Sequence, residues 1–139
     1  MLKNVDPLLS ADLLHALAAM GHGDTIALVD ANFPAAARAR RLIVMPGTEI
    51  GAVLAAVLSV LPCDRYVSTP AQLMQVGGDA AEPETYADFR ALLSANDWPM
   101  AEPIERFAFY TEAAQAFAIV LTGERRLYGN IILRKGVIP

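Results

Sequence analysis

Residues 25–30, Thr25-Ile26-Ala27-Leu28-Val29-Asp30, form a short apolar run that ends at an acid. Such a run, with no polar alternation, is typical of a strand that is buried on both faces of a sheet. Open α/β sheets bind ligands at the carboxyl ends of their strands, which is where Asp30 would lie. In the segment Asp30-Ala31-Asn32-Phe33-Pro34, however, the acid could equally serve only to form a turn. The run therefore predicts a central strand and leaves both interpretations of Asp30 open.

On either side of this strand, segments of helical periodicity alternate with apolar segments of strand length. Ser10 is the expected N-cap of the first helix, Gly21 its expected stop, and Pro62 ends the second helix. The expected helices span residues 8–20, 49–61, 83–94 and 109–116, and the expected strands span 25–29, 42–45, 73–76, 117–121 and 131–134. A loop is expected at 96–103, which contains two prolines. The alternation predicts an α/β domain with a mostly parallel central sheet.

The composition indicates one domain that covers residues 1–139. Of the 139 residues, 55% are hydrophobic and 19% are charged. This apolar content is enough for one core and leaves residues that could bury subunit interfaces in an oligomer. The formal net charge is −4 and no basic stripe is present, so we expect no nucleic-acid partner.

Several kinds of site are excluded by the residues that the chain lacks. Cys63 is the only cysteine, which rules out an intramolecular disulfide and a cysteine-rich zinc site. The two histidines, His15 and His22, do not have metal-ligand spacing, and no P-loop or dinucleotide fingerprint is present. We therefore expect neither a metal nor an organic cofactor. The longest apolar stretch, 50–61, is too short to cross a bilayer, so a cytoplasmic protein without a membrane partner is expected.

Three further polar clusters are candidates for chemistry because they fall at the ends of expected elements. In Gly21-His22-Gly23-Asp24, nothing bulky flanks the histidine, a natural proton carrier, although it could merely follow a helix end. In residues 105–110, Arg106 lies among aromatic residues and could bind sugar hydroxyls, or could pair with a neighbouring glutamate. The segment Tyr128-Gly129-Asn130 offers hydrogen-bond donors and acceptors, but could also be a plain turn before the last strand.

Taken together, these clusters resemble the RbsD/FucU family, and its fucose mutarotase branch in particular. The matching segments occur in family order along the whole chain, at residues 20–24, 30–34, 105–110, 116–120, 122–124 and 128–137. The ribose pyranase branch commonly has Tyr-Ala-Asn at the last site and a histidine near the position of Arg106. Gly129 and Arg106 therefore favour the fucose branch.

The resemblance implies a single Rossmann-like α/β subunit in a ring-shaped homodecamer, which interconverts the anomers of free L-fucose without a cofactor. Carried over by motif, His22 is the expected proton donor, and the expected sugar contacts are Asp30, Arg106, Tyr128, Gly129 and Asn130. The alternatives within the resemblance are a D-ribose pyranase-type activity and a non-catalytic ring that binds monosaccharides.

Anomer exchange needs a positioned acid and base but no metal or redox partner. The ring oxygen gains a proton while the anomeric hydroxyl loses one, the ring opens to an aldehyde, and it recloses on the other face. Asp30, Tyr128 or a water could be the base. An extended strand at 25–30 separates its ends by roughly 17 Å, much more than a monosaccharide spans. We therefore expect His22 and Asp30 to reach one sugar from adjacent subunits, unless the loop at 21–23 folds back over the strand.

Overall fold

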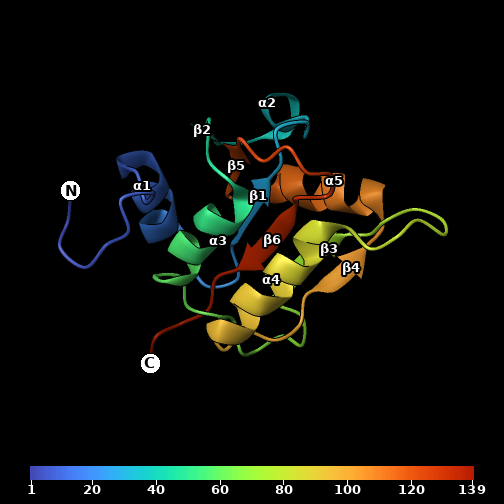
Figure 1. Ribbon diagram of the computed structural model, residues 1–139. Helices are drawn as coiled ribbons and strands as arrows, with labels where there is room; N and C mark the ends of the chain where they lie inside the picture. Colours follow the sequence, from blue (N-terminus) through green and yellow to red (C-terminus); the bar gives the residue numbers. More distant parts are fainter.

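The computed structural model describes residues 1–139 as five helices and six strands (Figure 1). In chain order the elements are α1 (Ala11–Ala19), β1 (Thr25–Val29), α2 (Ala35–Arg38), β2 (Leu42–Met45), α3 (Ile50–Leu58), β3 (Ala71–Met74), α4 (Glu84–Ala95), β4 (Glu102–Ile104), α5 (Arg106–Gln115), β5 (Ala118–Thr122) and β6 (Ile131–Arg134). None of these helices combines the length and the apolar character needed to cross a membrane.

All six strands form one sheet, in the order β2-β5-β1-β6-β3-β4. The pairs β2–β5, β5–β1 and β3–β4 are parallel, whereas β6 is antiparallel to both of its neighbours, β1 and β3. Five strands therefore point the same way and one points back, which confirms the predicted mostly parallel sheet. The reversed strand lies in the middle of the sheet, and Figure 1 shows it in red between β1 and β3.

Strand β1 is buried on both faces, as its apolar run predicted. Ile26 and Leu28 belong to the larger core, which is formed with residues of α1, α3 and α4. Ala27 and Val29 point to the other face, where a smaller core contains residues of α2 and α5. The four side chains have no exposed surface. The molecule is thus a three-layer α/β/α domain with β1 near its centre (Figure 1).

The helix starts follow local capping chemistry. Ser10 caps α1, because its hydroxyl accepts a hydrogen bond from the backbone N–H of Leu13 at 3.3 Å. Glu105 caps α5, with one carboxylate oxygen accepting from the N–H groups of Phe107 and Ala108. The cap makes α5 begin at Arg106, three residues before the predicted start at Phe109, so Arg106 lies in the first turn.

Two short elements were not predicted. Strand β4 lies within and just beyond the expected loop at 96–103, and it contains Pro103. Proline is tolerated there because β4 is an edge strand that pairs only with β3. Helix α2 is a single turn of alanines and one arginine, too short to produce a periodic pattern. Strand β3 also begins and ends two residues earlier than the predicted 73–76.

Candidate functional site

The reversed direction of β6 brings its first residues to the carboxyl edge of the parallel strands. Asn130 immediately precedes β6, and Asp30 immediately follows β1. The Asn130 side chain holds Asp30 twice: its oxygen accepts from the Asp30 backbone N–H at 3.0 Å, and its Nδ2 donates to the Asp30 carboxylate at 3.0 Å. Both residues are buried, at 5% and 3% exposure. Two predicted site residues 100 positions apart are therefore held together at one edge of the sheet.

A pocket of about 200 Å³ opens at this edge. It combines a carboxylate, an amide and a guanidinium with aromatic and apolar walls. Its lining residues are Asp30, Asn32, Phe33, Met74, Arg106, Tyr110, Leu127, Tyr128 and Asn130. Four of the five residues predicted as sugar contacts line this pocket, and the fifth, Gly129, lies between two of them in the chain. A few convergent polar groups within mostly apolar walls are the usual make-up of a small-molecule site.

Asp30 is the titratable group with a perturbed pKa in this pocket. Burial raises the pKa of its carboxyl above the ordinary value, while hydrogen bonds from Asn32, Asn130, Gly129 and Phe33 oppose that rise without cancelling it. A carboxylate with a raised pKa is a better proton acceptor than one on the surface. Asp30 can thus accept a hydrogen bond from a ligand hydroxyl and can also serve as a base.

Arg106 reaches the pocket from the first turn of α5. Its guanidinium carbon lies 5.0 Å from the ring centroid of Phe107 and 5.7 Å from that of Tyr110. It takes part in none of the ion pairs of the chain, and Glu105, one of its expected partners, caps the helix instead. The donors of Arg106 are therefore free for a ligand, and the aromatic rings limit how far the guanidinium can move.

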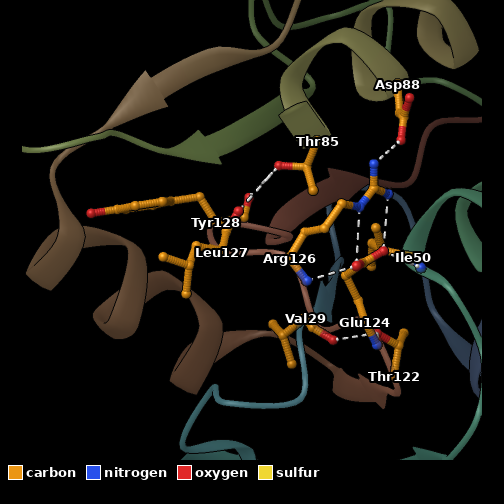
Figure 2. A network of polar contacts seen from close by, with 9 residues as sticks. All are labelled: Val29, Ile50, Thr85, Asp88, Thr122, Glu124, Arg126, Leu127 and Tyr128. Carbon is orange, nitrogen blue, oxygen red and sulfur yellow. Dashed lines mark hydrogen bonds and ion pairs between the residues drawn. The ribbon is translucent and has the colours of Figure 1, made fainter. Parts of the chain in front are cut away.

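The backbone at Tyr128 is left-handed, with φ of 59°, a conformation that costs energy for a residue other than glycine. Thr85, in the first turn of α4, donates its hydroxyl to the Tyr128 carbonyl at 3.1 Å (Figure 2). Figure 2 shows the Tyr128 ring pointing away from Arg126 and Glu124, which anchor the same loop. The hydrogen bond from Thr85 thus supports the backbone at this strained residue.

The loop before Tyr128 is anchored by the buried carboxylate of Glu124, which is 4% exposed. This carboxylate accepts hydrogen bonds from the Arg126 backbone and guanidinium at 2.8–3.1 Å, and from the Ile50 N–H at the start of α3 at 3.3 Å. Arg126 also pairs with Asp88 of α4 at 2.8 Å (Figure 2). The hydrogen bonds from Arg126 lower the pKa of Glu124 to about 2, against the opposing effect of its burial. The loop is therefore attached to two helices through one charged cluster.

Gly129 has no room for a side chain. A Cβ atom at this position would lie 2.9 Å from the Glu124 Cγ and 3.3 Å from the Asp30 Cβ. The φ angle of Gly129 is not in the left-handed region, so the constraint is one of space and not of backbone conformation. The side chains of Glu124 and Asp30 thus occupy the space that a side chain at position 129 would need.

His22 lies at the opposite edge of the sheet, before β1 begins. The Gly23 N–H donates to the Lys135 carbonyl at 2.9 Å, and the Arg134 guanidinium donates to the Gly23 carbonyl at 2.8 Å, both at the far end of β6. The loop at 21–23 therefore does not fold back over the strand. A single chain brings together Asp30, Arg106, Tyr128, Gly129 and Asn130, and it leaves His22 apart from them.

The predicted site residues did not include Asp64 or five residues that line the pocket: Asn32, Phe33, Met74, Tyr110 and Leu127. Met74 lines the pocket, because β3 ends two residues earlier than predicted. Leu127 lies at the pocket and is 67% exposed. Asp64 pairs with His22 at 3.2 Å, and the only sequence signal for it was an acid in the unassigned segment between Pro62 and β3.

The chain matches the model of the RbsD / FucU transport protein family over residues 3–138. It therefore belongs to this family, as its ordered motifs predicted. The match covers all of the predicted site residues.

The chain is similar over nearly its whole length to several solved structures, which include the following three. The fucose mutarotase from Streptococcus pneumoniae, crystallised in complex with L-fucose, is 38% identical with a TM-score of 0.96, over 99% of this chain and 100% of that one. FucU from Bifidobacterium longum is 36% identical with a TM-score of 0.93, over 99% and 100% of the two chains. RbsD from Bacillus subtilis, complexed with D-ribose, is 23% identical with a TM-score of 0.80 over the full length of both, a likeness that shows the shared fold.

The crowding at Gly129 predicts the effect of a single methyl group. We expect Gly129→Ala to lower the free energy of unfolding by about 1–3 kcal/mol, because Glu124 or Asp30 must move from its hydrogen bonds. The matched control is Gly51→Ala in α3, where the added Cβ would meet only Leu92 at an ordinary 3.9 Å and alanine favours the helix. Urea unfolding of both variants and of the wild type checks this. A Gly129→Ala variant as stable as the wild type would show that the site tolerates the methyl group.

Proposed function

We propose that the protein is an isomerase that acts on a free monosaccharide, and specifically an L-fucose mutarotase. The observation that carries the proposal is the pocket at the carboxyl edge of the sheet, where Asp30, Arg106 and Asn130 converge beside aromatic walls. The proposal is supported by the family match and by the fucose mutarotase from Streptococcus pneumoniae, to which the chain is similar over 99% of its length.

The pocket offers the two kinds of contact that a sugar needs. Asp30 accepts hydrogen bonds from hydroxyls, Arg106 donates them, and Tyr128 can do both. Phe33 and Tyr110, whose ring centroids lie 5.3 Å apart, form an apolar wall. Such a wall suits the less polar face of a sugar, and it also suits the methyl group that distinguishes L-fucose from a pentose.

We propose that the acid comes from a second copy of the chain. His22 of one subunit would approach the pocket of another, because the two lie at opposite edges of the same sheet within a chain. Both edges carry exposed apolar side chains that contact between copies could bury: Leu127 and Phe107 near the pocket, and Tyr66 near His22, at 67%, 65% and 78% exposure. The proposal requires a homo-oligomer, and the family resemblance implies a homodecamer.

The reaction then proceeds by paired proton transfers. Protonated His22 gives a proton to the ring oxygen as the bond between that oxygen and the anomeric carbon breaks. Asp30, whose pKa is raised by burial, takes the proton of the anomeric hydroxyl, and a carbonyl group forms. Rotation of the open-chain aldehyde and reversal of both transfers close the ring on its other face. Protons balance over the cycle, and both catalytic groups return to their starting states.

L-fucose is favoured over D-ribose by Gly129 and Arg106, the positions at which the two branches of the family differ. A D-ribose pyranase-type activity in the same pocket is the alternative within the same chemistry. A non-catalytic monosaccharide-binding ring is the alternative outside it, and it differs from the proposal in having no need for His22.

The proposed activity predicts accelerated anomer exchange. In saturation-transfer NMR on equilibrated sugars, we expect the protein to speed the exchange of L-fucose anomers more than that of D-ribose forms. His22→Ala should reduce the exchange rate by roughly a hundredfold or more, the range typical for loss of a general acid. His15→Ala, in the middle of α1, is the matched control and should retain the rate. Sugar binding without exchange in the wild type would favour the non-catalytic ring.

The shared site predicts that activity depends on assembly. In a dilution series followed by sedimentation and by fucose exchange, the specific activity should fall in step with the fraction of assembled protein. A folded monomer with the specific activity of the assembly would contradict the shared site while leaving the mutarotase proposal intact.

A further inference from the structure

The imidazole of His22 has one hydrogen-bonded side-chain partner, Asp64. The His22 Nε2 lies 3.2 Å from the Asp64 Oδ1. The carboxylate side chain is 3% exposed, whereas the imidazole is 45% exposed. One nitrogen of the ring is thus engaged by a buried group, and the rest of the ring is open to whatever approaches this edge.

Asp64 is itself fixed in place. Its Oδ1 also accepts the backbone N–H of Tyr66 at 3.0 Å, which closes a tight turn. The backbone of the neighbouring Cys63 pairs with that of Lys135 in an isolated antiparallel β-bridge. Gly136 packs so closely against Cys63 that an added Cβ would overlap the Cys63 carbonyl oxygen. The carboxylate is therefore attached to the end of β6, the same strand that holds the loop of His22 through Arg134.

The other charged groups near His22 are engaged elsewhere. Arg134 donates to the Gly23 carbonyl, and Lys135 donates to the carbonyls of Leu17 and Met20 at the end of α1. Asp24 accepts the Gly21 N–H at 2.8 Å. The Tyr66 ring lies 5.4 Å from the imidazole, tilted by 54°, and covers one side of it.

Asp64 carries a negative charge at neutral pH. Burial raises its pKa, but the hydrogen bonds from the Tyr66 N–H and from His22 outweigh that effect, so that the net pKa lies below the ordinary value. An ionised carboxylate can only accept hydrogen bonds. The nitrogen that faces it must therefore be the one that carries a proton, in the neutral as well as in the protonated ring.

We infer that Asp64 is a positioning residue for the reaction, which holds the His22 ring with Nε2–H toward itself and leaves Nδ1 as the atom that exchanges a proton with the sugar. The inference rests on the proposed function and deepens it. In the forward step the Nδ1 proton passes to the ring oxygen of the sugar. The neutral imidazole keeps its proton on Nε2, which donates a hydrogen bond to Asp64. The carboxylate remains ionised throughout, and it stabilises the protonated ring before the transfer.

Asp64→Asn tests the inference, because an asparagine oxygen can still accept the Tyr66 N–H and preserve the turn. In L-fucose exchange, we expect the maximal rate near pH 7.5 to fall on the order of tenfold or more, with the fucose concentration at half-maximal rate changed by less than about twofold.

The matched control is Asp97→Asn. Asp97 pairs with Arg65, the residue next to Asp64, at 3.0 Å, and its φ of 58° is one that asparagine also adopts. Asp97→Asn removes a negative charge from the same region without touching His22. The exchange rate and the pH profile of this variant should therefore match those of the wild type.

A second readout does not depend on activity. In ¹⁵N NMR of the imidazole rings, the neutral His22 of the wild type should hold its proton on Nε2. Asp64→Ala, which has no side-chain acceptor at this position, should show a mixture of the two tautomers. The chain has only two histidines, and His15→Gln assigns the signals. If Asp64→Ala keeps the wild-type ring signals, the inference is overturned, even where a loss of stability lowers the rate. If the wild type exchanges no sugar, the proposed function fails, while the ring spectra still decide what Asp64 does.

Discussion

The direction of β6 is the constraint on which the rest of the site depends. Strand β6 lies between β1 and β3 and runs against both of them. Its start therefore lies beside Asp30 at the carboxyl edge, and its end lies beside His22 at the other edge. A parallel strand in this place would have put Tyr128-Gly129-Asn130 with His22 and away from Asp30. The antiparallel pairing thus sorts the polar residues of the chain into two clusters, one at each end of the same strand.

Each of these two clusters contains a buried carboxylate, and the surroundings give the carboxylates different properties. At the pocket, burial dominates and raises the pKa of Asp30, which suits a proton acceptor. Near it, Arg126 holds Glu124 charged, with a pKa of about 2, and that charge anchors the loop of Tyr128. Beside His22, hydrogen bonds keep Asp64 ionised against its burial. In the proposed reaction, Asp30 thus takes part in proton transfer, whereas Glu124 and Asp64 hold other groups in position.

The sequence was sufficient for the fold where the pattern is local. The apolar run at β1 predicted a strand buried on both faces, and Ser10 predicted the start of α1. It was insufficient where a tertiary contact overrides the pattern: β4 forms around Pro103 only because an edge strand needs no N–H there, and α5 begins at Arg106 because Glu105 caps it. No local signal shows that β6 lies between β1 and β3, so the sequence could not place residues 128–130 beside Asp30.

The candidate site shows the same division. Motif resemblance led to His22, Asp30, Arg106 and the loop at 128–130, because their order along the chain is distinctive. Asp64 and Met74 have no such signal, since an isolated acid or methionine becomes informative only when the structure shows what it faces. The crowding at Gly129 likewise depends on the side chains of Glu124 and Asp30. Asp30 is distant in the sequence, and only the structure shows that both side chains face Gly129.

We propose that one sugar is held by two copies of the chain, and an experiment that mixes two inactive variants distinguishes this arrangement from a site within one chain. His22→Ala and Arg106→Ala, each inactive alone, are unfolded together and reassembled in equal amounts, and L-fucose exchange is measured by NMR. If sites are shared, random assembly restores both groups in about a quarter of them, and exchange should return to about that fraction of the wild-type rate. If every site lies within one chain, the mixture stays as inactive as its two parents, and the account is contradicted.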